Sequence, residues 1–439
     1  MAAERLGNGL GDSLGLSLPF VALEVVNRTE FTVSDKEKEI LRELAKHVSE
    51  LAHRSLEEEK RNLWYKHNDL EPTRPLIFCD PENGWYQIIR SGQLKCQGDL
   101  ARIWEYRLRK EIFWGEEMQD DRVIQPYFDV QHVFQESGRG LVERRISSGE
   151  DEGAYTWDPP LKDYKYFRNL RFLRFEIDYE RSEDLLNLAK EVLGDLLNVR
   201  LQGVWWWSLV RTADFVSLRG LQQMMFDTYD NPEGVHSVMA FLRDEALAKL
   251  DFLEEKGLLS LNNDGTYVGS GGFGWTHQLP QDGFKGKVRT RDVWGFGESQ
   301  ETVGLSPEMF EEFIFAYQLP VLQRFGLNAY GCCEPLNGRW HIIRKIPGLR
   351  RISVSAWADI EDMAEKLGRD YLFSCKPTPS DLAVPKMDED YMRTKLRNIV
   401  KTTRNCNVEI IMKDNHTIGN NPQNVTRWCR IAREEAESI

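Results

Sequence analysis

Hydrophobic and polar positions follow a helical period near the N-terminus. Ser34 precedes Glu37 by three residues, which is the spacing of a helix capping box. Apolar side chains then recur every three or four residues as far as Ala52, which predicts an amphipathic helix. A second box, from Ser55 to Glu58, opens a continuation or a second helix that runs to about Asn68. Pro72 and Pro75 close the unit, because proline cannot extend a helix. The pattern therefore predicts an N-terminal helical unit, preceded by a glycine-rich arm over residues 1–30.

From residue 74 onward, short apolar runs alternate with longer amphipathic stretches. The runs have the length of buried strands, and the stretches between them have helical spacing. Strands that alternate with helices predict a mostly parallel sheet covered by helices. The predicted strands are 75–79, 122–127, 173–177, 204–210, 258–261, 327–332, 351–355, 371–374 and 408–412, and the predicted helices are 99–112, 182–197, 232–255, 306–325, 359–367 and 389–402.

About eight strand–helix units follow residue 74, which is the number that closes a (β/α)8 barrel. An open doubly wound sheet usually has a glycine-rich first turn, and no G-x-G-x-x-G motif follows the first predicted strand. The run Gly271-Gly272-Phe273-Gly274 opens no clear helix. We therefore expect an α/β fold, with a TIM barrel over residues 74–439 and an N-terminal arm and helical extension over residues 1–73.

Composition and charge narrow the functional classes. Of the 439 residues, 41% are hydrophobic and 11% aromatic, which excludes a wholly disordered or collagen-like chain. The formal net charge of −13 argues against a dedicated nucleic-acid-binding protein. Because no apolar run has the length of a membrane helix and no signal-peptide pattern opens the chain, we expect a cytoplasmic protein that does not bind membranes. The odd number of cysteines, seven, favours reduced thiols.

Cysteine and histidine side chains follow three predicted strands, at the ends where a barrel has its active site. Cys332, Cys333 and Glu334 follow one of these strands, Cys375 follows a second, and His416 follows the last. Thiolates and imidazoles are typical zinc ligands, and three protein ligands with one open position make a catalytic zinc site. Free cysteines are also among the most buried residues, so core packing remains the alternative.

Other side chains are candidates for catalysis or substrate binding. Glu298, Gln300 and Glu301 lie between an apolar run and a capped helix, where carboxylates can act in acid–base catalysis or belong to a solvated loop. His277 follows the glycine-rich run. Trp206 lies on a predicted strand and belongs either to the core or to the wall of a substrate pocket. The motifs of serine hydrolases, P-loop proteins and H-E-x-x-H metalloproteases do not occur.

The C-terminal half contains a distinctive order of segments. The helix SPEMFEEFIFAYQLPVLQRFG is followed by LNAYGCCEP, RRISVS, YLFSCKPTP and the closing VEIIMKDNHTIGNNPQNV. This order resembles the uroporphyrinogen decarboxylase superfamily, whose closing segment contains a similar Pro-x-x-Asn-Val motif. Its members are (β/α)8 barrels, and they include zinc-dependent methyltransferases that act with corrinoid proteins. The resemblance covers residues 35–436 and is most specific from Ser306 onward.

The resemblance also implies a set of zinc ligands. In the methyltransferase branch, a His-x-Cys pair and a later cysteine hold the metal. Tyr330-Gly331-Cys332 lies where His-x-Cys is expected, so Cys332 matches a ligand and Tyr330 does not. His416 lies where the later cysteine is expected, and Cys333, Glu334 or Cys375 would complete the set. The Arg-Gln-Ala-Gly-Arg signature of the porphyrinogen decarboxylases is absent.

The function implied by this resemblance is methyl transfer between a small methylated substrate, of the methyl ether or methylamine type, and a separate corrinoid protein. Zn²⁺ would polarise the heteroatom that carries the methyl group. A homodimer is also expected. The residues assigned to the pocket are Tyr330, Glu298 and Glu301 for catalysis and His277, Gln300, Asp129 and Trp206 for substrate binding.

Two alternatives keep the barrel and change the chemistry. One is a metal-independent decarboxylase or lyase that acts on a small carboxylated compound, with Arg211 or Lys376 binding the carboxylate. The other is a barrel that binds a ligand or partner without catalysis. Substitution of Cys332 separates these hypotheses, because only the zinc enzyme needs that thiol for its metal.

Overall fold

The computed structural model describes residues 31–142, 144–147, 155–203 and 205–438. The predicted arm over residues 1–30 lies outside this part of the chain. The chain forms two compact units. The first unit comprises Met1–Gln135, Ile177–Val204 and Cys375–Ile439, and the second comprises Glu136–Glu176 and Trp205–Ser374.

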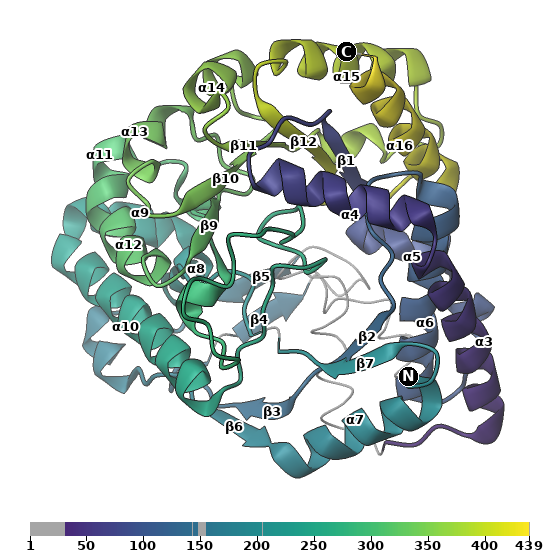
Figure 1. Cartoon of the computed structure of the whole chain (residues 1–439). Helices are drawn as coiled ribbons and strands as arrows, with labels where there is room; N and C mark the ends of the chain where they lie inside the picture. Colours follow the sequence, from purple (N-terminus) through teal and green to yellow (C-terminus); the bar gives the residue numbers. More distant parts are fainter. Residues whose placement is uncertain (1–30, 143, 148–154, 204, 439) are drawn as a thin grey trace. The chain divides into compact units, whose positions relative to one another are not determined.

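Helices and strands alternate along the chain, which confirms the predicted α/β class (Figure 1). The main sheet has six strands in the order β1-β12-β11-β10-β9-β8. A closed eight-stranded barrel is not found in the part of the chain that the structure describes, and the barrel stays a prediction. The strands of this sheet are β1 (Leu76–Cys79), β8 (Trp294–Gly297), β9 (Leu327–Tyr330), β10 (Leu349–Val354), β11 (Leu372–Cys375) and β12 (Asn407–Met412).

In the first unit, β1 and β12 pair in parallel, with Leu76 opposite Glu409 and Cys79 opposite Met412. Both strands are buried along their whole length. A second parallel pair joins β2 (Tyr127–Val130) to β7 (Asn198–Leu201). The helices of this unit are α3 (Asp35–Ala52), α4 (Ser55–Asn68), α5 (Trp85–Ile88), α6 (Asp99–Phe113), α7 (Tyr179–Leu193), α15 (Glu389–Thr402) and α16 (Pro422–Glu437), with the short turns η1 (Glu82–Gly84), η2 (Ser91–Gln93), η3 (Trp114–Met118) and η9 (Pro379–Asp381).

The predicted capping box at the start of α3 is present, and its glutamate also accepts hydrogen bonds from the start of a second helix. One oxygen of Glu37 accepts hydrogen bonds from the backbone N–H of Ser34 (3.0 Å) and from its hydroxyl (2.7 Å). The other oxygen accepts from the N–H groups of Gln97 (2.9 Å) and Gly98 (2.8 Å), at the start of α6. Burial opposes ionisation, but these hydrogen bonds outweigh it and lower the pKa of Glu37 to about 2.

We expect Glu37→Gln to lower the free energy of unfolding by about 2 kcal/mol at neutral pH, because an amide cannot accept all four hydrogen bonds. The native pKa lies below the unfolded value, so Glu37 contributes fully above pH 4.5. The difference between wild type and variant should therefore shrink as the pH falls from 4.5 toward 2. Urea unfolding at several pH values measures it. The matched control is Glu39→Gln, on the exposed face of the same helix; equal pH profiles for the two variants would contradict the assignment.

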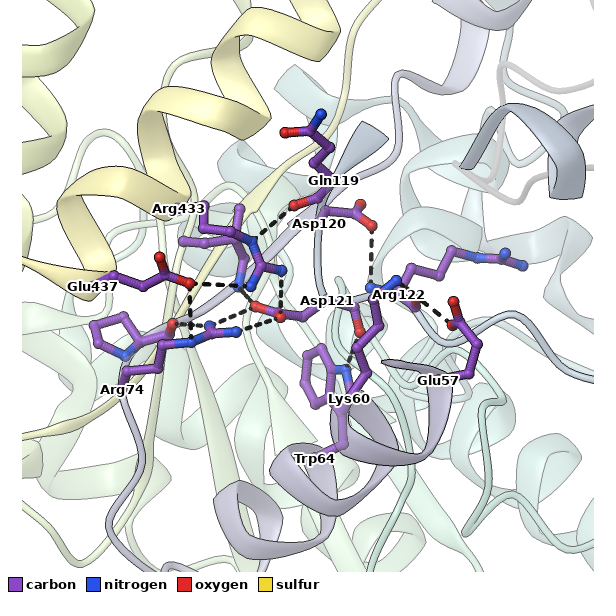
Figure 2. Close-up of polar contacts among 12 residues, drawn as sticks. Glu57, Lys60, Trp64, Arg74, Gln119, Asp120, Asp121, Arg122, Arg433 and Glu437 are labelled. Atoms are coloured by element: carbon purple, nitrogen blue, oxygen red, sulfur yellow. Dashed lines mark hydrogen bonds and ion pairs between the residues drawn. The ribbon is translucent and has the colours of Figure 1, made fainter. Parts of the chain in front are cut away.

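Asp121 joins three elements of the first unit, as Figure 2 shows. Its buried carboxylate accepts two hydrogen bonds from Arg74 (2.7 and 2.8 Å) and one from Arg433 on α16 (2.7 Å). It also accepts from the backbone N–H of Ile77 on β1 (2.7 Å). The indole of Trp64 on α4 donates to the Asp121 carbonyl (2.7 Å). A single aspartate therefore connects α4, β1 and α16.

In the second unit, β8, β9 and β10 pair in parallel, with Trp294 opposite Leu327 and Gly297 opposite Tyr330. The predicted helix over 306–325 is interrupted by a π-helical turn, η7 (Glu311–Phe315). The other helices of this unit are α8 (Thr212–Arg219), α9 (Leu221–Asp230), α10 (Pro232–Lys256), α11 (Pro307–Phe310), α12 (Ala316–Leu322), α13 (Trp340–Ile343) and α14 (Ile360–Leu367). The unit also contains the antiparallel pair β4 (Arg144–Ser147) and β5 (Tyr155–Asp158) and the turns η4 (Tyr164–Asn169), η5 (Thr290–Asp292), η6 (Gln300–Thr302) and η8 (Asn337–Arg339). The chain passes from one unit to the other within β3 (Val133–Glu136) and within β6 (Phe175–Asp178).

Among the described residues, no helix is long and apolar enough to cross a membrane.

Candidate functional site

The carboxyl ends of β8 and β9 carry most of the predicted site residues. Because the two strands are parallel and in register, the segments that follow them leave the sheet at the same edge. Gly331 follows β9 with a positive φ of 97°, and its N–H donates to the carbonyl of Gly297 (2.8 Å). A Cβ at Gly331 would lie 2.8 Å from Leu336 Cδ1. Glycine is therefore required for the turn that leads to Cys332.

Glu334 holds the two segments together. It is fully buried, and its carboxylate accepts hydrogen bonds from the backbone N–H groups of Ser299 (2.8 Å) and Cys332 (2.9 Å). Burial raises the pKa of Glu334, and these two N–H groups oppose the shift. Since each oxygen accepts a backbone hydrogen bond, Glu334 fixes the loops after β8 and β9.

Cys332 and Cys333 form a pair of neighbouring thiols. Their sulfur atoms lie 3.7 Å apart, with Cys332 buried and Cys333 exposed. The hydroxyl of Ser270 contacts the Cys332 sulfur at 3.4 Å. Ser270 directly precedes the glycine-rich run, and no feature of the sequence singles it out. The pair combines one accessible sulfur with one that is shielded from solvent.

Two further carboxyl groups lie in the loop after β8. Glu298 is 1% exposed, and its carboxylate accepts from the backbone N–H of Gln300 (3.2 Å). Burial, together with the negative charges of Glu301 and Glu334, raises the pKa of Glu298 well above its ordinary value. Glu301 is half-buried and accepts a hydrogen bond from the hydroxyl of Thr212 (2.7 Å). Glu298 is therefore suited to carry a proton at neutral pH.

Tyr330 ends β9 in a buried hydrogen-bond network. Its hydroxyl donates to Gln318 Oε1 (2.7 Å) and lies 3.2 Å from the hydroxyl of Ser299. The amide of Gln318 donates to the carbonyl of Glu298 (2.9 Å), and Arg339 donates to Ser299 Oγ (3.3 Å). Burial raises the pKa of Tyr330 well above its ordinary value. Tyr330 therefore positions the loop that carries Glu298. The sequence did not identify Gln318 or Arg339, although a glutamine among the apolar residues of α12 is a signal of such a network.

Two other predicted residues of the second unit have different environments. Trp206 is partly buried and packs against the core that includes Leu250 and Phe325, with its ring 5.9 Å from that of Phe325. This contact is the core alternative that the sequence left open. His277 is exposed.

Three predicted residues belong to the first unit. Asp129 on β2 forms a two-point ion pair with Arg200 on β7 (2.7 and 2.9 Å), so its carboxylate is engaged within the β2–β7 pair. Cys375 is buried at the end of β11, and burial raises its pKa to about 12. His416 is exposed.

The described side chains supply only part of the ligand set that a zinc ion needs. Tetrahedral zinc, with Zn–S bonds of about 2.3 Å, places two thiolates about 3.8 Å apart, close to the 3.7 Å between Cys332 and Cys333. Glu334, however, is engaged by backbone N–H groups. Within the described ranges, no group of three or more His, Cys, Asp or Glu side chains is arranged to hold a metal ion. The thiol pair fits two ligands, and the remaining ligands are not assembled around it.

Comparisons with known proteins include a weak structural likeness. No protein-family model matches the chain, and no curated protein matches it. A solved structure described as a methyltransferase from Methanosarcina mazei is similar, with 10% identity and a TM-score of 0.47, over 86% of this chain and 98% of that chain.

Proposed function

We propose that the residues after β8 and β9 form the active site of a methyltransferase that acts on a small methylated substrate. The observation that supports this proposal is the convergence of a buried carboxyl group, Glu298, with the thiol pair at two adjacent strand ends. The resemblance in the sequence adds zinc and a separate corrinoid protein as the expected cofactor and methyl acceptor. Cys332 and Cys333 would supply two of the zinc ligands, and the proton transfers assigned to Glu298 and Glu301 use their own carboxyl groups.

Methyl transfer breaks the bond between the methyl carbon and a heteroatom of the substrate. The heteroatom leaves with the bonding electron pair and needs a proton, and the methyl group passes to the acceptor. Glu298 donates that proton as general acid. Glu301, which is half-buried and held by Thr212, is placed to return a proton from solvent to Glu298. Tyr330 and Gln318 keep the Glu298 loop in place.

Replacement of Cys332 tests the proposal. Elemental mass spectrometry after zinc loading should find about one zinc per chain in the wild type and much less in Cys332→Ser. Transfer from methylamines and methyl ethers to a free corrinoid should fall in parallel. Cys406→Ser is the matched control, because Cys406 lies on the first unit and outside the site. Undiminished methyl transfer by a metal-free Cys332→Ser protein would overturn the roles of zinc and of the thiol pair in the proposed site.

A second candidate function is a metal-independent lyase that binds a carboxylated substrate through Arg211. Nε and Nη2 of Arg211 are buried and have no hydrogen-bond partner among the described residues, although Nη2 lies 4.0 Å from Glu245. Arg211 has a φ of 66°, and the next residue, Thr212, contacts Glu301. Lys376, the other predicted cation, belongs to the first unit.

The two enzymes and a non-catalytic barrel differ in their response to substitution. A lyase should release carbon dioxide or another fragment equally well in Cys332→Ser and lose this activity in Arg211→Gln. In a non-catalytic barrel, both substitutions should change stability alone. Loss of methyl transfer in Cys332→Ser, with no fragmentation of carboxylated compounds by the wild type, would exclude both alternatives.

A further inference from the structure

Lys110 on α6, in the first unit, has a buried ammonium group without a counter-ion. The residue is 4% exposed, and its Nζ lies 4.8 Å from the ring centre of Trp85 and 5.0 Å from that of Trp114. In the part of the chain that the structure describes, this ammonium makes no ion pair and no hydrogen bond. The equally buried Lys60 differs, since it donates to the carbonyl of Arg122 (3.0 Å). An unpaired buried cation is costly, which is why such groups concentrate at functional sites.

The two tryptophan rings are fixed by the carboxyl end of β1. The indole of Trp85 donates to Asp80 Oδ1 (2.8 Å), and the indole of Trp114 donates to the carbonyl of Cys79 (3.0 Å). The rings lie 4.5 Å apart at an angle of 67°. The aromatic surface around the Lys110 ammonium is therefore built into the fold and is held at a strand end.

Charged groups surround this amine without pairing with it. Burial lowers the pKa of Lys110 to about 8, and Asp80 has the largest opposing effect. Arg122 lowers the pKa further, but its own charge is paired with Glu111 (2.6 Å). Glu82 also acts on Lys110, and is itself 3.4 Å from Lys413 Nζ. Near neutral pH the protonated form of Lys110 still predominates, but its free amine is far more abundant than that of an exposed lysine.

The backbone around this cluster is strained. Glu82, which follows β1, has a φ of 48°, and Asp414, which follows β12, has a φ of 61°. Non-glycine residues rarely adopt the left-handed region, and they do so most often at functional sites. Because β1 and β12 are adjacent parallel strands, both strained residues belong to the same sheet edge as Asp80.

We propose that Lys110 is a nucleophilic amine that forms an imine with a small aldehyde or ketone bound against Trp85 and Trp114. The nitrogen lone pair attacks the carbonyl carbon and forms a C–N bond while the C–O π bond breaks. The oxygen then leaves as water, using both protons lost from nitrogen, and a C=N bond remains. Asp80 transfers these protons. An amine on a desolvated lysine is the usual nucleophile for this chemistry. The site lies in the first unit and does not rest on the proposed methyl transfer.

Reductive trapping tests the proposal on the full-length protein. Glyoxylate with cyanoborohydride converts each imine to a stable carboxymethyl amine, and peptide mass spectrometry gives the rate at each lysine. At neutral pH we expect Lys110 to react on the order of 100-fold faster than Lys46, which is 70% exposed, because far more of Lys110 is free amine. Denaturation in urea should abolish this preference. Labelling of native Lys110 at or below the rate of Lys46 would overturn the proposal.

Two variants separate reactivity from structure. Lys110→Arg keeps the positive charge and cannot form an imine, so it should lose the fast label while Lys46 is labelled as before. At a pH well above 8, where the Lys110 amine is free with or without the Asp80 charge, Asp80→Asn should slow labelling of Lys110 by removing the proton-transferring group, with the same far-ultraviolet circular dichroism. If Lys110→Arg does not fold, the comparison of native with urea-unfolded wild type decides the question. An unchanged Lys110 rate in folded Asp80→Asn would overturn the role given to Asp80.

Discussion

Replacement of Asp121 by alanine is expected to lower the free energy of unfolding by about 3–5 kcal/mol. The substitution removes the acceptor for Arg74, Arg433 and the Ile77 N–H. Among the carboxylates of the described residues, the two guanidinium groups then keep only their longer contacts to Glu437, at 3.9 and 3.4 Å. Burial alone would raise the pKa of Asp121, but Arg74 and Arg433 outweigh it and hold the pKa below its ordinary value. The stabilisation by the Asp121 carboxylate is therefore fully present above the pKa of an aspartate in the unfolded chain, and it is lost as the pH falls through the lower pKa of the folded protein.

Urea unfolding monitored by tryptophan fluorescence measures this effect. Asp121→Asn should be intermediate, because the amide keeps one acceptor oxygen but loses the charge. Asp184→Ala is the matched control in the same unit, since Asp184 is exposed on α7; its unfolding free energy should change by less than about 0.5 kcal/mol. Equal stability of Asp121→Ala and Asp184→Ala would show that the network in Figure 2 contributes little.

Glu298→Gln is expected to reduce kcat for the proposed methyl transfer by about 10²–10⁴-fold, the usual range for loss of a general acid. Glutamine has nearly the same shape and keeps an oxygen for the Gln300 N–H, but it cannot supply the proton. The raised pKa of Glu298 adds a pH signature. Wild-type kcat should fall at alkaline pH as the carboxyl group ionises, and the variant should lack this decline.

Steady-state kinetics over a pH series, with substrates found in the methyl-transfer screen, makes the measurement. Glu361→Gln, at an exposed position in the first turn of α14, removes the same charge outside the site and should leave kcat unchanged. Full activity in a folded Glu298→Gln protein would remove Glu298 from the proposed mechanism and leave the thiol pair as the remaining candidate.

The sequence by itself determined several of the helices and strands. The capping box and apolar period give α3 at Asp35–Ala52, and the helix predicted over 389–402 coincides with α15. Among the strands, β1 and β12 lie within a residue of the predicted ranges. These elements depend on interactions between residues three or four positions apart or on short apolar runs, and both are visible in one sequence.

Other strands were decided by tertiary contacts. The strand predicted over 122–127 is found as β2 at Tyr127–Val130, because the N–H of Ile124 donates to Glu57 on α4 (2.8 Å). No strand occurs at 258–261, where the carbonyl of Leu258 accepts from the indole of Trp205 (2.8 Å). In the predicted strand over 204–210, residues 205–210 are not a strand, and Val204 lies outside the described residues. In the first two cases a distant side chain binds backbone groups that a sheet would have used.

For the candidate site too, some features follow from the sequence and others only from the tertiary structure. The sequence placed Glu298, Tyr330 and Cys332 at or near the ends of strands, and strand order then made them neighbours. Only the tertiary structure showed that Glu334 is engaged by backbone N–H groups and that Lys110, one lysine in an amphipathic helix, is buried without a counter-ion. Burial and charge compensation depend on residues that are remote in sequence. The amino-acid order therefore determined which chemical groups are available, and the packing of distant segments decided which of them are paired, shielded or reactive.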